Sequence, residues 1–85
     1  MLIRHATPAD FSVLQDIELA SFETLREAGA VVGEASASSN AELRRYLAQS
    51  LLYAACTPDG PPVGYCGGYV AEGWLHVGEM DVHPR

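Results

Sequence analysis

The hydrophobic pattern of the last predicted strand, WLHVGEMDV, changes phase halfway along. Leu75 and Val77 occupy odd positions, whereas Met80 and Val82 occupy even ones. Because side chains alternate strictly between the two faces of a strand, an unbroken strand would place one of these pairs on the wrong face. One extra residue at Gly78 restores a common apolar face, since glycine readily forms a β-bulge. The pattern therefore predicts a bulged strand.

The same bulge would gather polar residues on the other face of this strand. With Gly78 and Glu79 sharing one side, His76, Glu79 and Asp81 fall together opposite the apolar face. A bulge also turns backbone amides and carbonyls out of the hydrogen-bonded ladder. We therefore expect free backbone groups beside two carboxylates and an imidazole.

Two amphipathic helices are predicted upstream. Thr7 can cap the first helix, Pro8 suits its first turn, and Asp10 completes a pattern like a capping box. Gly29 is a plausible stop for this helix. One buried face is predicted at three- and four-residue steps, over Phe11, Leu14, Ile17, Ser21 and Leu25.

The second helix follows a weakly patterned segment at residues 30–39, which we expect to be a mobile loop. Ser39 to Glu42 form a second capping box, and a shorter apolar stripe predicts the buried face of this helix. That stripe consists of Leu43, Leu47 and Leu51.

A hairpin is predicted next, with strands at 52–56 and 63–71 joined by a turn. Such a hairpin would pair Cys66 with Tyr53 and Cys56 with Val63, so the two cysteines should not be bonded. The order of elements is then β-α-α-β-β-β, without repeats or linkers. We expect one α+β domain over residues 1–85 with a mixed, mostly antiparallel sheet.

Composition limits the partners of the chain. Eleven acidic residues against five basic ones give a net charge of −6, which disfavours nucleic acid and anionic membranes. The N-terminal segment lacks the basic start and apolar core of a signal peptide, and the chain has no apolar run long enough for a membrane span. We expect a cytoplasmic protein.

Three motifs in this order resemble the GNAT superfamily of N-acetyltransferases. They are IRHATPAD at residues 3–10, PVG at 62–64 where the hairpin returns, and MDVHP at 80–84 in the last strand. The resemblance spans the chain, and the order and spacing of the motifs carry it. It implies the N-terminal half of a GNAT fold, with the bulge of its fourth strand beside the thioester of acetyl-CoA.

The resemblance also implies a reaction, the transfer of an acetyl group from acetyl-CoA to a primary amine. Backbone groups of Met80, Asp81 and Val82 would bind the pantetheine arm and polarise the acetyl carbonyl. The attacking amine must lose a proton, and a side chain on the bulge face would accept it. Glu79 is the first candidate for this base, followed by His76 and then Asp81.

Two other interpretations of the polar face remain open. Polar residues on one face of a strand are often only solvated, and Glu79 would then have no role in proton transfer. Alternatively, His76, Glu79, Asp81 and His83 could be ligands of a metal ion, although the chain has no compact ligand motif such as HExxH. We expect no metal.

The acceptor amine is set, in the family that this chain resembles, largely by the region between the first two helices and by C-terminal elements. Phe22, Glu23 and Arg26 lie near the entrance of that region and are the candidate substrate contacts. The stronger interpretation is that all three are ordinary helix positions, with Phe22 in the core and the two charged residues solvated.

The sequence ends at Arg85, before the Arg/Gln-x-x-Gly-x-Gly/Ala loop with which GNAT enzymes bind the CoA pyrophosphate. We therefore expect a truncated domain that is incomplete as an isolated chain: a truncated or proteolysed copy of a longer enzyme, a chain completed by a second fragment, or a swapped homo-oligomer. The last strand would be an open edge above an uncovered apolar face. A second hypothesis follows, a non-catalytic module that joins a partner through this strand.

Overall fold

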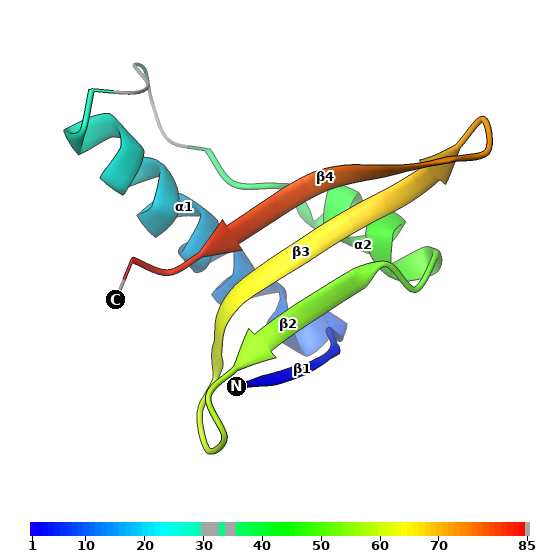
Figure 1. Ribbon diagram of the computed structural model, residues 1–85, viewed down its shortest axis with the longest axis horizontal. Coiled ribbons are helices and arrows are strands. Elements are labelled where there is room, and N and C mark those ends of the chain that lie inside the picture. The colour runs from blue at the N-terminus through cyan, green and yellow to red at the C-terminus, as the bar shows by residue number, and fades with distance from the viewer. Residues whose placement is uncertain (30–32, 34–35, 85) are drawn as a thin grey trace.

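A computed structural model describes residues 1–29, 33 and 36–84 as an α+β fold (Figure 1). Four strands form one sheet in the order β1-β2-β3-β4, and every pairing among them is antiparallel. The elements are β1 (Leu2–His5), the 3-10 turn η1 (Pro8–Asp10), α1 (Phe11–Glu27), α2 (Asn40–Ala48), β2 (Leu52–Cys56), β3 (Pro62–Ala71) and β4 (Trp74–Val82).

This arrangement confirms the predicted element order and the mostly antiparallel sheet, while the described strands contain no parallel pair. The predicted loop at residues 30–39 lies in part outside the described residues. None of the helices in the described part of the chain is long and apolar enough to cross a membrane.

The core lies between the two helices and one face of the sheet (Figure 1). Its largest fully buried side chains are Leu14, Ile17, Leu43 and Leu52. Burial of one such side chain contributes about 1.5–3 kcal/mol to folding. The helices thus cover one face only, and the other face of the sheet has no layer above it among the described residues.

The start of α1 is fixed by a charged contact as well as by its cap. Both guanidinium nitrogens of Arg4 donate to the carboxylate of Asp10, at 2.8 and 2.9 Å, and the backbone N–H of Thr7 donates to Asp10 Oδ2 at 2.8 Å. The Arg4 guanidinium and the Thr7 hydrogen bond hold the pKa of Asp10 at about 2. The predicted capping box of Thr7 and Asp10 is confirmed, and the contact of Arg4 with Asp10 ties β1 to the start of α1.

The buried face of α1 differs from the prediction at its far end. Leu25 is 46% exposed, because the last turns of α1 extend past the sheet (Figure 1). Glu18, four residues after Leu14, lies instead on the buried face. The predicted stripe is therefore correct at Leu14 and Ile17 and wrong at Leu25.

The β2–β3 hairpin pairs Cys66 with Tyr53, as predicted. Cys56 faces Pro62 rather than Val63, because the register shifts by one residue after Ala55. Both cysteines are free thiols, which confirms that they do not bond to each other.

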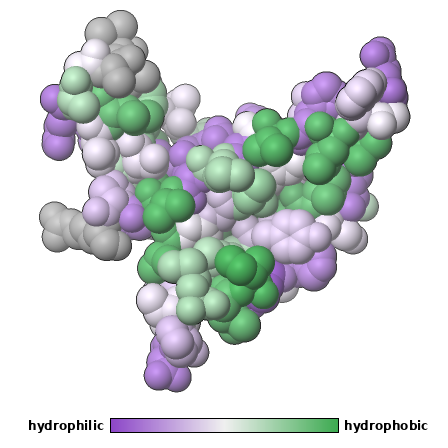
Figure 2. Space-filling view, viewed as in Figure 1, coloured by the Kyte–Doolittle hydropathy of each residue, from purple (hydrophilic) through white to green (hydrophobic). Residues whose placement is uncertain are grey.

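The predicted bulge is present in β4. Glu79 pairs with Gly67 and Val77 pairs with Gly68, so Gly78 is the extra residue between them. Leu75, Val77, Met80 and Val82 are 60–69% exposed. Their cross-strand partners place all four on the face without helices, and Figure 2 shows hydrophobic side chains gathered over that face. The apolar residues thus share one face, as their spacing predicts.

Candidate functional site

The bulge is held in place by Tyr46, a buried residue of α2. A Cβ atom added to Gly67 would lie 2.4 Å from Tyr46 Cδ2, and one added to Gly78 would lie 2.4 Å from Tyr46 Oη. The tyrosine ring therefore needs glycine on both strands beneath it. This packing turns Gly78 toward the helices, on the side that carries Glu79, and explains why the bulge occurs at this point.

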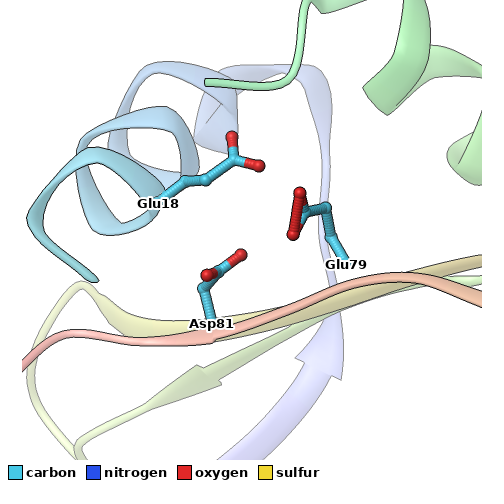
Figure 3. A group of neighbouring side chains, drawn as sticks. All are labelled: Glu18, Glu79 and Asp81. Carbon is cyan, nitrogen blue, oxygen red and sulfur yellow. The ribbon is translucent and has the colours of Figure 1, made fainter. Parts of the chain in front are cut away.

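Three carboxylates converge beneath α1 (Figure 3). Glu18 points down from α1, while Glu79 and Asp81 point up from β4, and one oxygen of each lies within 4.8 Å of the others. Two of these residues were predicted from the strand pattern. Glu18 was not predicted. The sequence did contain a signal for it, because its spacing of four residues from Leu14 places an acid on the buried stripe of α1.

Glu18 is only 6% exposed and is bound by Ser38, which precedes α2. The backbone N–H of Ser38 donates to Glu18 Oε2, and the Ser38 hydroxyl donates to Glu18 Oε1 at 2.9 Å. Gln15 fixes this segment in turn, because its Nε2 donates to the Ser38 carbonyl at 3.1 Å and to Asn40 Oδ1 at 2.8 Å. Both oxygens of Glu18 are therefore satisfied from one residue.

The cluster changes the proton affinity of Glu79. Burial, followed by hydrogen bonding to the carboxyl groups of Glu18 and Asp81 and by their charges, raises the pKa of Glu79 to about 9. Three carboxylates in one half-buried space repel one another when all are ionised, so a proton retained at neutral pH is expected. Glu79 is thus a carboxyl group that keeps its proton at neutral pH and releases it near pH 9.

Tyr65 of β3 adds a hydroxyl beside the cluster. It pairs with Asp81 across the strands, and burial raises the pKa of its phenol, with the charges of all three carboxylates acting in the same direction. Tyr65 Oη and Asp81 Oδ2 are buried and make no hydrogen bond of good geometry among the described residues. Ser38 lies near the Tyr65 hydroxyl and lowers the pKa of this phenol in part, against the larger effect of burial. From the sequence we expect Tyr65 only to pack on the sheet, because the strand register alone brings it beside these carboxylates.

His76, the second candidate base, lies on the same face but outside the cluster. Its ring stacks on that of Tyr69, with 4.9 Å between centroids, and Tyr69 stacks on Tyr46 at 6.5 Å. The guanidinium of Arg45 lies 4.7 Å above the Tyr69 ring. The structure therefore places His76 in an aromatic stack on the far side of the bulge.

The outer edge of β4 carries free backbone groups. His83 N–H donates to the Val63 carbonyl at 2.7 Å, which marks their position as a hydrogen-bonded pair of the antiparallel ladder. Because such pairs alternate with non-bonded ones, the amides and carbonyls of Met80 and Val82 point away from β3, whereas those of Asp81 point toward it. No further strand pairs with this edge among the described residues.

The candidate substrate contacts lie at the far end of α1. Arg26 Nη1 and Glu23 Oε1 form an exposed ion pair at 3.3 Å, and Phe22 is half-buried. Glu23 also lines an open hollow that His83 reaches from the end of β4. The structure thus places Glu23 near the end of β4 and pairs Arg26 with Glu23.

The four residues considered as metal ligands are not assembled as a set. Among the described residues, Glu79 and Asp81 meet Glu18, while His76 and His83 are not in that group. Three carboxylates are a ligand type that suits Mg²⁺ or Ca²⁺, but Ser38 already donates to both oxygens of Glu18.

Comparison with known proteins gives no assignment: no family model, no curated protein and no solved structure matches this chain significantly.

Proposed function

We propose that this chain is part of an N-acetyltransferase of the GNAT type, which moves an acetyl group from acetyl-CoA to a primary amine. The observation that supports this most is the bulge at Gly78. It sets Glu79 on a strand whose outer edge pairs with no further strand in the part of the chain that the structure describes. Acyl transfer requires both components, a proton acceptor and fixed donors for the developing oxyanion.

Glu79 would act as the base in this reaction. A primary ammonium has no lone pair, so it must pass a proton to a carboxylate before the nitrogen attacks the thioester carbon. The C–N bond forms, the C–S bond breaks, and the electron pair leaves with the CoA thiolate. With a pKa of about 9, most Glu79 is protonated at neutral pH, so activity should increase with pH toward that value.

The backbone of β4 would bind acetyl-CoA. The outward amides of Met80 and Val82 are available to the pantetheine arm and to the acetyl oxygen, as the resemblance implies. The backbone of Asp81 is committed to β3, so its contribution would come through its carboxylate beside Glu79. The CoA pyrophosphate would need a phosphate-binding loop supplied by a further segment or a second chain.

The experiment combines native mass spectrometry with an acetylation assay. The purified protein is measured with and without acetyl-CoA and then incubated with a panel of primary amines between about pH 7 and 9.5, a range chosen to bracket the ionisation of Glu79. We expect one bound CoA per assembly, an acetylated amine, and a rate that rises with pH. Glu79→Gln should lower kcat/KM by about 10²- to 10⁴-fold, while retaining CoA binding.

Glu72→Gln is the matched control, since Glu72 is exposed in the turn before β4. It removes the same charge and should leave the rate unchanged. An assembly that neither binds acetyl-CoA nor acetylates any amine would refute the proposal, as would a Glu79→Gln variant of full activity.

A second candidate function is favoured by the open face of the sheet. The exposed side chains of Leu75, Val77, Met80 and Val82 form an apolar surface beside an unpaired edge, which is typical of a strand that pairs with another chain. A shallow pocket of about 220 Å³ lies on the sheet between Ile3, Tyr53 and Met80. A stoichiometric partner without CoA in the mass spectrum would favour this non-catalytic module over acetyl transfer.

A further inference from the structure

We propose that the outer edge of β4 binds an extended segment of a partner protein in which apolar and basic residues alternate. This inference rests on the second candidate function, the pairing of β4 with another chain, and names the chemistry of the partner. It does not depend on acetyl transfer. The part of β4 that carries it is residues 79–82, where the backbone groups of Met80 and Val82 point away from β3.

The two faces of this stretch require different neighbours. Met80 and Val82 lie exposed on the open face, whereas Glu79 and Asp81 lie on the face under α1 (Figure 3). Because directly opposed residues of paired strands share a face, an added strand sets alternate side chains beside the apolar pair and beside the acidic pair. Apolar side chains suit the first position and basic side chains suit the second.

The acidic pair has no cationic partner in the part of the chain that the structure describes. The chain contains no lysine, and four of its five arginines lie among the described residues. Each of these four is engaged elsewhere: Arg4 with Asp10, Arg26 with Glu23, Arg44 over the Phe11 ring and Arg45 over the Tyr69 ring. A positive charge beside Glu79 and Asp81 would therefore come from another chain.

Tyr65 points independently to a ligand beside these acids. Its side chain is only 4% exposed, and its hydroxyl makes no hydrogen bond of good geometry among the described residues. Tyr65 pairs with Asp81 across the strands, so both side chains lie under α1, and Asp81 Oδ2 is buried without such a bond as well. Buried polar atoms in folded proteins are nearly always hydrogen-bonded. A lysine ammonium offers three donors and no acceptor, which suits a group of oxygens of this kind.

A second copy of this chain does not meet the same requirement. Two β4 strands that paired antiparallel with their apolar side chains on one face would set Glu79 and Asp81 of one copy opposite acids of the other, and like charges in that position are destabilising. Among the described strands, Arg4 is the only arginine, and Asp10 holds both of its guanidinium nitrogens. Charge complementarity thus favours a different polypeptide.

The test is an NMR titration of the full ¹⁵N-labelled chain with two seven-residue peptides, one alternating valine with lysine and the other alternating valine with glutamine. We expect the lysine peptide to bind about tenfold more tightly, because opposite charges on paired strands stabilise the pairing. Its binding should shift the amide signals of Met80 and Val82 and slow their hydrogen exchange, since these outward amides become hydrogen-bonded.

Asp81→Asn keeps the shape of the side chain and removes its charge, so the preference for the lysine peptide should fall to about threefold or less. Asp59→Asn is the matched control, because Asp59 is exposed in the turn between β2 and β3 and should leave the preference unchanged. Amide spectra report the folding of each variant. The comparison of the two peptides uses the native chain, so it carries the test if Asp81→Asn does not fold.

Three results would overturn the inference. Equal binding of the two peptides at β4 would leave strand pairing in place but remove the requirement for basic residues. Binding of the lysine peptide without changes at Met80 and Val82 would mean general attraction to an acidic chain. Binding of neither peptide, including exclusion by a self-associated chain in analytical ultracentrifugation, would remove this partner altogether. None of these measurements uses acetyl-CoA or an amine, so failure here is distinguishable from failure of the proposed acetyl transfer.

Discussion

Replacing Glu79 by glutamine should remove most of the pH dependence of stability between about pH 5 and 9. The carboxyl group has a pKa of about 9 in the folded chain against an ordinary value of 4.5. The folded state therefore binds more protons than the unfolded state across this window. Since stability decreases with pH wherever the folded state binds more protons, the native protein should be most stable near the acid end and lose that stability as pH rises toward 9.

The size of the effect follows from linkage. One fully linked proton changes the free energy of unfolding by about 1.4 kcal/mol per pH unit. Glu79 is only partly buried, so solvent screening reduces the total, and we expect a loss on the order of 2 kcal/mol from about pH 5 to 9. Glutamine is close in shape to the protonated acid but does not ionise, so the variant should match the native protein at the acid end and exceed it at pH 9.

The assay is urea denaturation followed by circular dichroism at several pH values, with Glu72→Gln as a control that keeps the native slope. Two results would refute the reasoning. One is a native stability that rises with pH over this window. The other is a Glu79→Gln variant that keeps the native slope, because the slope would then come from another group.

Three further predictions concern packing and charge. Gly78→Ala places a Cβ against Tyr46 and should cost about 1–3 kcal/mol in urea denaturation, and an unchanged midpoint would contradict the tight packing described here. Asp10→Asn loses the paired contacts with Arg4 and should lower the free energy of unfolding by about 1 kcal/mol near neutral pH. Because the native Asp10 pKa is about 2, the difference in stability between the variant and the native protein should vanish as pH falls from about 4 through 2. A difference that persists at that pH would contradict the charge argument. Val77→Ser on the open face should change stability by less than about 0.5 kcal/mol and reduce self-association in analytical ultracentrifugation, whereas a large loss of stability in dilute monomer would mean that the residue is packed.

The part of the fold that the sequence predicts well is the part set by local periodicity. The phase change around Gly78 located the bulge, and the alternation on either side of it gave the correct faces of β4. The capping box at Thr7 and Asp10 is likewise local, because its partners are three residues apart. These features depend on neighbours along the chain, which a sequence displays directly.

The part that sequence analysis missed is set by contacts between distant elements. Glu18 meets Glu79 only when α1 lies across β4, and Tyr65 reaches the cluster only through the register of β3. The error at Leu25 has the same origin, since periodicity gives the face of a helix but not how far the sheet extends beneath it. Tyr46 was overlooked because its role depends on two glycines that lie far from it in sequence.

Strand β4 reverses the usual relation between polarity and burial. Its acids Glu79 and Asp81 lie under a helix, and its apolar side chains face outward. Crowded carboxylates reduce stability at neutral pH, and exposed apolar side chains contribute little to it, so neither feature is explained by the folding of this chain alone. Departures from these local rules are typical of functional sites. The acids would suit the proposed proton transfer at the bulge and the apolar face would suit a covering element, so both proposed functions rest on the departures found on β4.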